Sequence, residues 1–395
     1  MPMPGIYLHI PFCVRKCNYC DFYSEALYPG LKSEANLNMI NSPGFFKDFP
    51  DFLCKEIDLF VSNNDIDKSI DSIFFGGGTP SLLNPSQVGQ IVEKLYEKFD
   101  IASDVEISLE CNPGTLTYRK LKDYKNSGIN RLSIGSQSFL ESELRFLQRI
   151  HSPEEITKAY EYAREAGFDN VSIDLIFALP KQTKENLDFS LTKTLELRPE
   201  HISAYSLIYE PGTPLFRDLK NNKITPLGDD TVADLYLFVI ERLSAAGYKQ
   251  YEVSNFAVED KFKCRHNLNY WQAGEYFAFG PSAHGYFNNV RYWNYRSINK
   301  YYESLNDNVP PVEAKEKLSG HDRLNEYIML GLRAEGIDVR VLAEKFDFDL
   351  FSRAGDFISE LIENGFMVEN GSKLSMTAKG YSVCDEIILK IIEKI

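Results

Sequence analysis

Short apolar, β-branched runs recur between Ile6 and Leu207, with amphipathic helical patterns between them. The six runs are Ile6–Ile10, Ser72–Phe75, Val105–Leu109, Arg131–Ile134, Asn170–Ile176 and His201–Leu207. Helical periodicity and helix-end signals mark Ser86–Phe99, Glu154–Ala166 and Lys184–Leu197. This alternation predicts a parallel sheet with right-handed crossovers. Because it fades beyond Leu207, we expect an α/β fold with an open, partial (βα)6 barrel resembling a TIM barrel.

The carboxyl ends of the predicted strands carry polar or glycine-rich residues. In parallel α/β folds these ends form one rim, where ligands bind. In chain order they carry a cysteine loop, Gly76-Gly77-Gly78-Thr79-Pro80, Glu110-Cys111-Asn112-Pro113, Gly135-Ser136-Gln137-Ser138, Asp174 and Tyr205-Ser206. The sequence therefore predicts one ligand site built from six units.

The cysteine loop contains Cys13, Cys17 and Cys20 in a C-x3-C-x2-C pattern. A four-iron, four-sulfur cluster has four corners that bind thiolate, and a structural zinc ion also takes four ligands. Three thiolates on a short loop can hold three corners of a cluster and leave the fourth iron open. The spacing therefore indicates redox chemistry at an open iron.

Two other roles of these cysteines, in disulfides or in a zinc site, are less well supported by the sequence. A disulfide framework is disfavoured, since the seven cysteines give an odd total and no secretory segment precedes them. A zinc site would need a fourth ligand, for which His9 is the nearest candidate. The other cysteines are scattered singly and are expected to be small buried hydrophobes; they are Cys54, Cys111, Cys264 and Cys384.

The glycine run lets backbone groups approach a ligand closely. It lacks the ending of a phosphate loop, so it implies no nucleoside triphosphate. Beside an open cluster it suits an amino-acid-like ligand, with Glu110 as a ribose partner and Arg149 as a partner for a carboxylate. Gln137 and Asp174 could complete the rim. Each residue alone also fits an ordinary strand-end hydrogen bond, but their convergence favours a binding site.

Together these motifs resemble the radical S-adenosylmethionine (SAM) superfamily, in particular its branch related to oxygen-independent coproporphyrinogen III oxidase. The likeness runs from Tyr7 to about Gly285. It implies that Cys13, Cys17 and Cys20 bind a [4Fe-4S] cluster whose open iron chelates SAM. It also implies SAM contacts from Tyr7, Tyr19, Gly77, Gly78, Thr79, Glu110, Gln137, Arg149 and Asp174. Ser206 and Ala283 are weaker candidates for the same role.

Two subgroups of this branch differ in sequence motifs that can be compared with this chain. The oxidases resemble C-x3-C-x2-C-x-C, whereas this chain has Phe22 at the place of the last cysteine. The second subgroup, of heme chaperones, shares the Cys-Asp-Phe ending and a later His-Asn-x-x-Tyr-Trp motif, here His266 to Trp271. The resemblance thus favours a heme chaperone that binds heme and transfers it to an acceptor protein. The alternative is the oxidase of porphyrin biosynthesis, which converts two propionates of coproporphyrinogen III to vinyl groups, so enzyme activity stays open.

The His266 motif is chemically suited to heme. Neutral imidazole is a common axial ligand of heme iron, and Tyr270 and Trp271 could pack against the macrocycle. From residue types alone, His266 fits a hydrogen-bonded histidine of the core or surface better. The heme role of His266, Tyr270 and Trp271 therefore depends on the resemblance, with His284 as a second candidate ligand.

We expect three regions: a barrel domain over residues 1–220 with an insertion at 23–50, a middle region over 221–310, and a winged-helix-like domain over 311–395. The last region shows helix patterns and a hairpin signal at Asp322–Arg333, Val339–Phe346, Phe351–Asn364 and Asn370-Gly371. Because acidic residues outnumber basic ones there, a structural or docking role is favoured over DNA binding.

Charge and hydropathy limit the partners. The chain has 57 acidic and 43 basic residues, a net charge of -14, which disfavours broad binding to nucleic acid or anionic lipid. It shows no signal-peptide pattern and no apolar run near the roughly 20 residues that span a bilayer. We therefore expect a cytoplasmic protein. The family resemblance implies heme, a heme-acceptor protein and an electron donor for the cluster as its partners, and it allows a homodimer. A zinc-stabilised nucleic-acid module is the third class considered.

Overall fold

The large sheet contains the six predicted strands, parallel and in chain order. A computed structural model describes residues 3–27 and 44–395. The strands are β1 (Gly5–Ile10), β4 (Ser69–Gly77), β5 (Asp100–Cys111), β6 (Arg131–Gln137), β7 (Val171–Phe177) and β8 (His201–Ser206). The predicted α/β class is thereby confirmed. Much of the predicted insertion at 23–50 lies outside the described residues.

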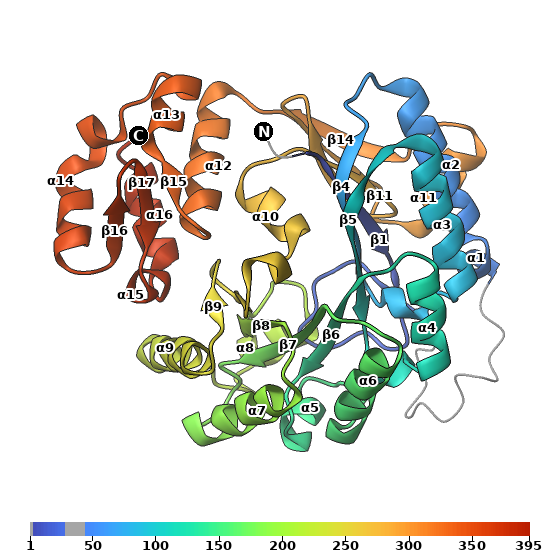
Figure 1. Cartoon of the computed structure of the whole chain (residues 1–395), viewed down its shortest axis with the longest axis horizontal. Coiled ribbons are helices and arrows are strands. Elements are labelled where there is room, and N and C mark those ends of the chain that lie inside the picture. Colours follow the sequence, from blue (N-terminus) through green and yellow to red (C-terminus); the bar gives the residue numbers. More distant parts are fainter. Residues whose placement is uncertain (1–2, 28–43) are drawn as a thin grey trace.

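Helices cover the outer face of these strands (Figure 1). The helices of this part of the chain are α1 (Gly44–Lys47), α2 (Phe49–Asn63), α3 (Pro85–Lys98), α4 (Tyr118–Asn126), α5 (Glu141–Phe146), α6 (Pro153–Glu165), α7 (Lys184–Leu197), α8 (Pro214–Lys220) and α9 (Asp229–Ala245). Of these, α8 packs beside the cysteine loop, where its Leu215 amide donates to the Asn18 carbonyl. Local signals explain their starts: Ser152 and Glu155 form a capping box at α6, with Pro153 in its first turn. Buried strand residues such as Ile107, Leu132 and Ile173 belong to the main core, and the alternate residues of each strand face the other side.

The sheet continues beyond the predicted six strands on both edges. β11 (Tyr276–Phe279) pairs parallel with β1, followed outward by antiparallel β12 (His284–Phe287), β13 (Val290–Asn294) and β14 (Val312–Lys317). At the other edge lie β10 (Asn255–Ala257) and β9 (Lys249–Gln250), and a separate pair joins β2 (Phe12–Cys13) to β3 (Glu25–Ala26). The strand-helix alternation could not reveal β9, β10, β12, β13 and β14, because antiparallel neighbours need no helical crossover. It also missed β11, which pairs parallel with β1 although it lies far from it in the chain. The predicted boundary at residue 311 places β14 in the last region, whereas β14 pairs within the large sheet.

The C-terminal elements have a hydrophobic core of their own, which includes Ile328, Leu342, Ile358 and Leu374. The predicted helices and hairpin are present, with two more helices after them. The elements are α12 (Gly320–Leu332), β15 (Ile337–Asp338), α13 (Val339–Phe346), α14 (Leu350–Glu363), β16 (Met367–Asn370), β17 (Lys373–Met376), α15 (Ala378–Tyr381) and α16 (Cys384–Ile392). Figure 1 shows them in red, beside the large sheet.

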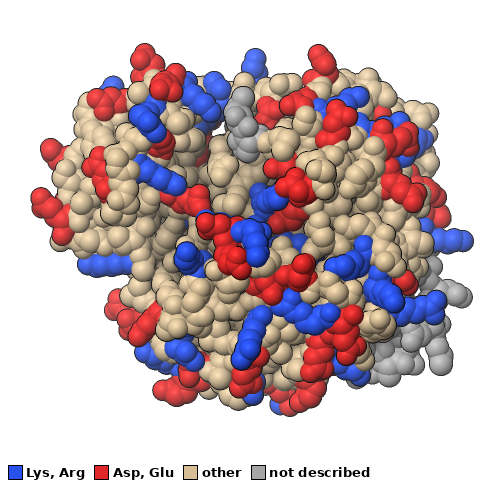
Figure 2. All heavy atoms as spheres, in the orientation of Figure 1, with Lys and Arg blue, Asp and Glu red and all other residues tan. Residues whose placement is uncertain are grey.

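The described residues also form the α-helices α10 (Arg265–Trp271) and α11 (Ile298–Asn306). The chain around β10 contacts the C-terminal elements at two points. The Val253 amide donates to the Arg333 carbonyl, and Lys263 forms an ion pair with Glu335. Acidic and basic side chains are interspersed over the face shown in Figure 2. No helix within residues 3–27 and 44–395 is long and apolar enough to cross a membrane.

A buried carboxyl group on α2 makes the stability of this fold depend on pH. Glu56 accepts hydrogen bonds from the Gly280 amide at 2.8 Å, the Tyr301 hydroxyl at 2.6 Å and the Asn294 amide. Burial raises the pKa of Glu56 from 4.5 to about 7, although these donors oppose the shift. The folded state thus retains a proton that the unfolded chain loses above its ordinary pKa.

We therefore predict that Glu56 by itself makes the free energy of unfolding fall as the pH rises from about 4.5 to about 7, whereas the buried histidines, whose pKa values are lowered, act in the opposite direction. The contribution of Glu56 to this decline is at most about 3 kcal/mol. In Glu56→Gln this contribution should be absent, because the amide does not titrate, so the variant should gain stability relative to the wild type as the pH rises through this range. Thermal unfolding of both proteins between pH 4.5 and 8 measures this difference. Parallel pH profiles would show that Glu56 is ionised in the folded state.

Candidate cluster and ligand site

The seven cysteines fall into two environments. Cys13, Cys17 and Cys20 are part-exposed free thiols on the loop after β1, and all three line one small hollow there. The other four are buried free thiols in the cores or, for Cys264, at the start of α10. The three loop cysteines are thus placed to bind a group that enters from solvent, whereas Cys111 borders the neighbouring large cavity as a buried thiol.

The glycine loop after β4 holds the cysteine loop in place. The Gly78 amide donates to the Ile10 carbonyl at 2.8 Å, and the Thr79 amide donates to the Phe12 carbonyl at 2.7 Å. The Thr79 hydroxyl lies 3.5 Å from the Cys13 sulfur. A Cβ on Gly78 would stand 2.7 Å from the Phe12 carbonyl oxygen, so only glycine permits this approach.

Arg149 supplies positive charge beside the cysteines. Its Nη1 lies 3.5 Å from the Cys17 sulfur, and its Nη2 donates to the Gly135 carbonyl at 2.7 Å. Burial raises the pKa of Cys13, and it raises the pKa of Cys20 to about 11. These thiols therefore need a bound cation to ionise, as an iron cluster provides. The donor set fits a cluster held at three corners.

The geometry does not favour zinc with His9 as the fourth ligand. His9 Nε2 lies 2.8 Å from the Tyr23 carbonyl oxygen, and Nδ1 lies 3.1 Å from the Tyr7 hydroxyl. Both ring nitrogens thus already have partners. Within residues 3–27 and 44–395, no three His, Cys, Asp or Glu side chains are grouped to hold a single metal ion.

A larger cavity of about 590 Å³ adjoins the cysteine loop. Its walls include all nine residues predicted to contact SAM: Tyr7, Tyr19, Gly77, Gly78, Thr79, Glu110, Gln137, Arg149 and Asp174. Cys20, Phe22 and Ser206 also line it. Ala283 does not lie on this wall and is fully buried between β11 and β12. The structure thus brings together residues that are 167 positions apart in the chain, from Tyr7 to Asp174.

Two carboxyl groups in the cavity lie on β5 and β7. Burial and the nearby charge of Asp174 raise the pKa of Glu110 to about 8. Asp174 accepts hydrogen bonds from Ser133 at 2.8 Å and Ser172 at 2.9 Å, and burial raises its pKa. A ligand with hydroxyl groups or a positive charge would stabilise the ionised form of both carboxyls.

A β-bulge directs Gln137 into the cavity. The pairing of β6 with β7 shifts between Gly135 and Gln137, and Gln137 has a φ of 67°. A left-handed conformation at a residue other than glycine is often associated with a functional site.

The His266 motif lies at the other end of β1 from the cysteines. A Cβ on Gly5, the first residue of β1, would stand 3.0 Å from His266 Nδ1. The His266 ring stacks with Phe74 at 5.2 Å, and Nε2 lies 2.8 Å from the Tyr270 hydroxyl. His266 and Tyr270 line the large cavity, but Trp271 does not. His284 is also absent from the cavity wall and stacks on Trp293.

Comparison with known proteins identifies the family. Residues 7–192 match the radical SAM superfamily model, and residues 318–383 match the HemN C-terminal domain. The chain is 32% identical over 387 residues to the heme chaperone HemW of Bacillus subtilis (strain 168), covering 98% of each chain. The chain belongs to the HemW family of radical SAM proteins. A second HemW relative, from Escherichia coli (strain K12), is 38% identical over 72% of this chain and 70% of its own.

A solved structure supports the fold of this HemW family member. Coproporphyrinogen III oxidase (HemN) from Escherichia coli matches 99% of this chain and 91% of its own, with a TM-score of 0.80 and 24% identity. This likeness confirms the α/β fold and the arrangement of the C-terminal elements.

A row of buried serines crosses the inner face of the sheet, and it was not predicted from the sequence. Ser72, Ser108, Ser133, Ser172 and Ser203 are buried on five consecutive strands of the sheet, beside Arg131 on β6. Polar residues at alternate positions of otherwise apolar strands were the available signal, because alternate side chains share one face. In this HemW family member the inside of the sheet is therefore polar well below the cysteine loop.

Proposed function

We propose that this protein is a heme chaperone of the HemW type, which binds a [4Fe-4S] cluster, SAM and heme and transfers heme to an acceptor protein. The main observation in support is that three part-exposed cysteines adjoin a cavity lined by all nine expected SAM contacts. Family membership supports the same role. The proposed setting is the cytoplasm, with a separate protein as electron donor.

Different residues of the site would bind the cluster and SAM. Cys13, Cys17 and Cys20 would hold the cluster, which supplies an open iron and one-electron chemistry when bound. Arg149 would pair with the SAM carboxylate, and Glu110 and Asp174 would accept hydrogen bonds from hydroxyl groups. Gly77 and Gly78 keep the wall free of side chains, so that a ligand can approach the backbone.

The heme site is proposed at His266 with Tyr270, while Trp271 would act through packing. Burial lowers the pKa of His266 to about 3, so its imidazole is neutral, the form that binds iron. Nε2 is occupied by the Tyr270 hydroxyl at 2.8 Å. Heme binding through this nitrogen therefore requires that contact to break.

Heme titration of the anaerobically reconstituted protein tests this proposal. The wild type should bind about one heme per chain, and His266→Ala should weaken binding by on the order of tenfold or more and shift the Soret band. Tyr270→Phe should bind heme at least as tightly as the wild type, because it frees Nε2. A Soret band that is unchanged in His266→Ala would remove His266 as the axial ligand, and a wild type that binds no heme would refute the chaperone role.

The oxidase is a second candidate, because HemN from Escherichia coli shares the fold. Phe22 stands where the oxidase pattern has a further cysteine, and its side chain is 67% exposed at the cavity. The chain thus has no thiol at the position that distinguishes the oxidases. This observation favours the chaperone.

A further inference from the structure

Arg131 is a buried cation on the wall of the large cavity. It is the first residue of β6, at the opposite end of that strand from Gln137, and its side chain is only 2% exposed. It does not line the small hollow formed by the three loop cysteines. A guanidinium group in such a place needs hydrogen-bond acceptors, because its burial is costly.

The residues around Arg131 leave it poorly satisfied. Its Nη1 reaches the Ser108 hydroxyl at only 3.5 Å, and its Nε has no hydrogen-bond partner. Among residues 3–27 and 44–395, no carboxylate oxygen lies within 4.0 Å of the Arg131 guanidinium nitrogens, the distance that defines an ion pair. The guanidinium therefore retains unused donor capacity beside an open cavity.

The charges of Glu106, Asp174 and Glu110 act on Arg131, but no ion pair joins them to it, and the first two carboxyl groups are held by other donors. Glu106 Oε1 accepts from the Arg265 amide at 3.0 Å and from the Ser108 hydroxyl at 3.4 Å. Asp174 accepts from Ser133 and Ser172, as described above. Neither carboxylate therefore forms an ion pair with Arg131.

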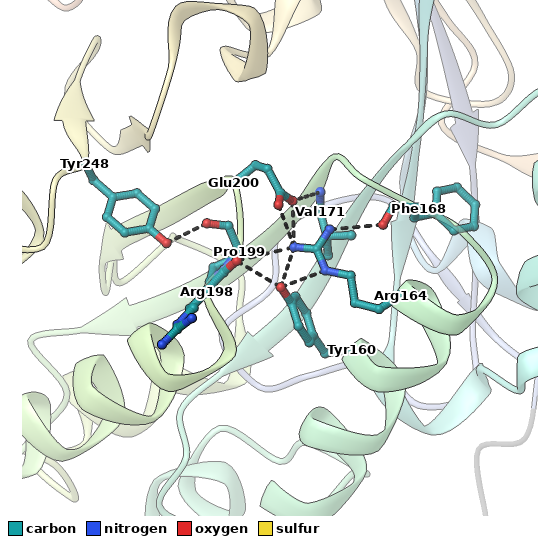
Figure 3. Close-up of polar contacts among 8 residues, drawn as sticks. All are labelled: Tyr160, Arg164, Phe168, Val171, Arg198, Pro199, Glu200 and Tyr248. Atoms are coloured by element: carbon teal, nitrogen blue, oxygen red, sulfur yellow. Dashed lines mark hydrogen bonds and ion pairs between the residues drawn. The ribbon is translucent and has the colours of Figure 1, made fainter.

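Arg164 shows what a structural arginine of this fold looks like (Figure 3). Its guanidinium donates to the Glu200 carboxylate at 2.7 Å, the Phe168 carbonyl at 3.0 Å and the Tyr160 hydroxyl at 2.8 Å. It is thus satisfied by protein groups from several segments, although it is less buried than Arg131.

We propose that Arg131 binds a carboxylate of a ligand that occupies the cavity. The guanidinium fork matches a carboxylate in shape and charge. This inference rests on the proposed function, whose two ligands both carry carboxylates. Arg149 is placed for the carboxylate of SAM beside the cysteines. Arg131 pairs across the sheet with Ser108, which pairs with Phe74, the ring on which His266 stacks, and Arg131 and His266 both line the cavity. A heme propionate is therefore the expected source.

Binding assays on the reconstituted protein test this proposal with paired ligands. Arg131→Met should weaken heme binding by about tenfold or more and should leave the affinity for heme dimethyl ester unchanged. Arg131→Lys should recover part of the loss, because it keeps the charge. In a parallel arm, SAM is compared with 5′-methylthioadenosine, which has no carboxylate. A loss of affinity for heme but not for its dimethyl ester, or for SAM but not for 5′-methylthioadenosine, supports the proposal and shows which ligand supplies the carboxylate.

Stability measurements separate ligand binding from a structural role. Arg164→Met should lower the melting temperature of the ligand-free protein more than Arg131→Met does, and should leave ligand affinities unchanged. Unchanged affinities in Arg131→Met, or equal losses for a ligand and its carboxylate-free analogue, would overturn the proposal. If the wild type binds no heme, the proposed function fails, and the SAM arm still decides whether Arg131 binds a carboxylate.

Discussion

Replacing any one of Cys13, Cys17 or Cys20 with alanine is expected to abolish the iron-sulfur cluster. The three thiols lie on one loop, line one hollow and have no substitute among the buried cysteines. Two remaining thiolates cannot hold three corners of a cube. Iron analysis after anaerobic reconstitution should fall from about four iron atoms per chain to less than about one.

Cys54→Ala is the matched control for these variants. Cys54 is a buried free thiol that packs in the main core. Its replacement should lower stability slightly and leave the iron content at the wild-type level. Full iron content in the Cys13, Cys17 and Cys20 variants, or its loss in Cys54→Ala alone, would contradict the assignment of the ligands.

Gly78→Ala should cause a comparable loss of the cluster without touching a cysteine. The new methyl group would lie 2.7 to 2.9 Å from the backbone atoms of Ile10 and Phe12, which cannot rotate away. Relief of this overlap must lengthen the hydrogen bonds that join the glycine and cysteine loops, at a cost of about 1–3 kcal/mol. We expect iron content and SAM affinity to fall severalfold, as measured by iron analysis and calorimetry.

Gly89→Ala provides the control for this substitution. Gly89 lies inside α3, and its nearest neighbour to a new Cβ is the Ser127 hydroxyl at 3.4 Å. Alanine there should be neutral or stabilising by up to about 1 kcal/mol, because it favours the helix. If Gly78→Ala retained full iron content, the two loops would not depend on each other as the structure indicates.

The sequence predicted the parallel part of the fold well, for physical reasons. The six parallel strands β1, β4, β5, β6, β7 and β8 each contain a buried apolar run, and helix signals lie between them. Parallel strands place their carboxyl ends on one rim. That rule alone predicted that Glu110, Gln137 and Asp174 would meet, as they do in the cavity. The contact between glycine and cysteine loops follows from the same topology.

Other features depend on contacts between distant segments and could not be predicted. The position of α10 at the start of β1, far along the strand from the cysteines, depends on packing against Gly5, Ser72 and Phe74. The occupied Nε2 of His266 likewise depends on the rotamer of Tyr270. The heme residues and the domain boundaries therefore stay predictions, while the α/β class and the family are established.

The central claim is that this chain carries heme rather than making its precursor. One anaerobic, reconstituted sample should be divided between a heme titration and an incubation with coproporphyrinogen III, SAM and a reductant. The account predicts heme binding, transfer of that heme to an apo acceptor protein, and no vinyl product. Turnover of coproporphyrinogen III to protoporphyrinogen IX, without stable heme binding, would contradict it.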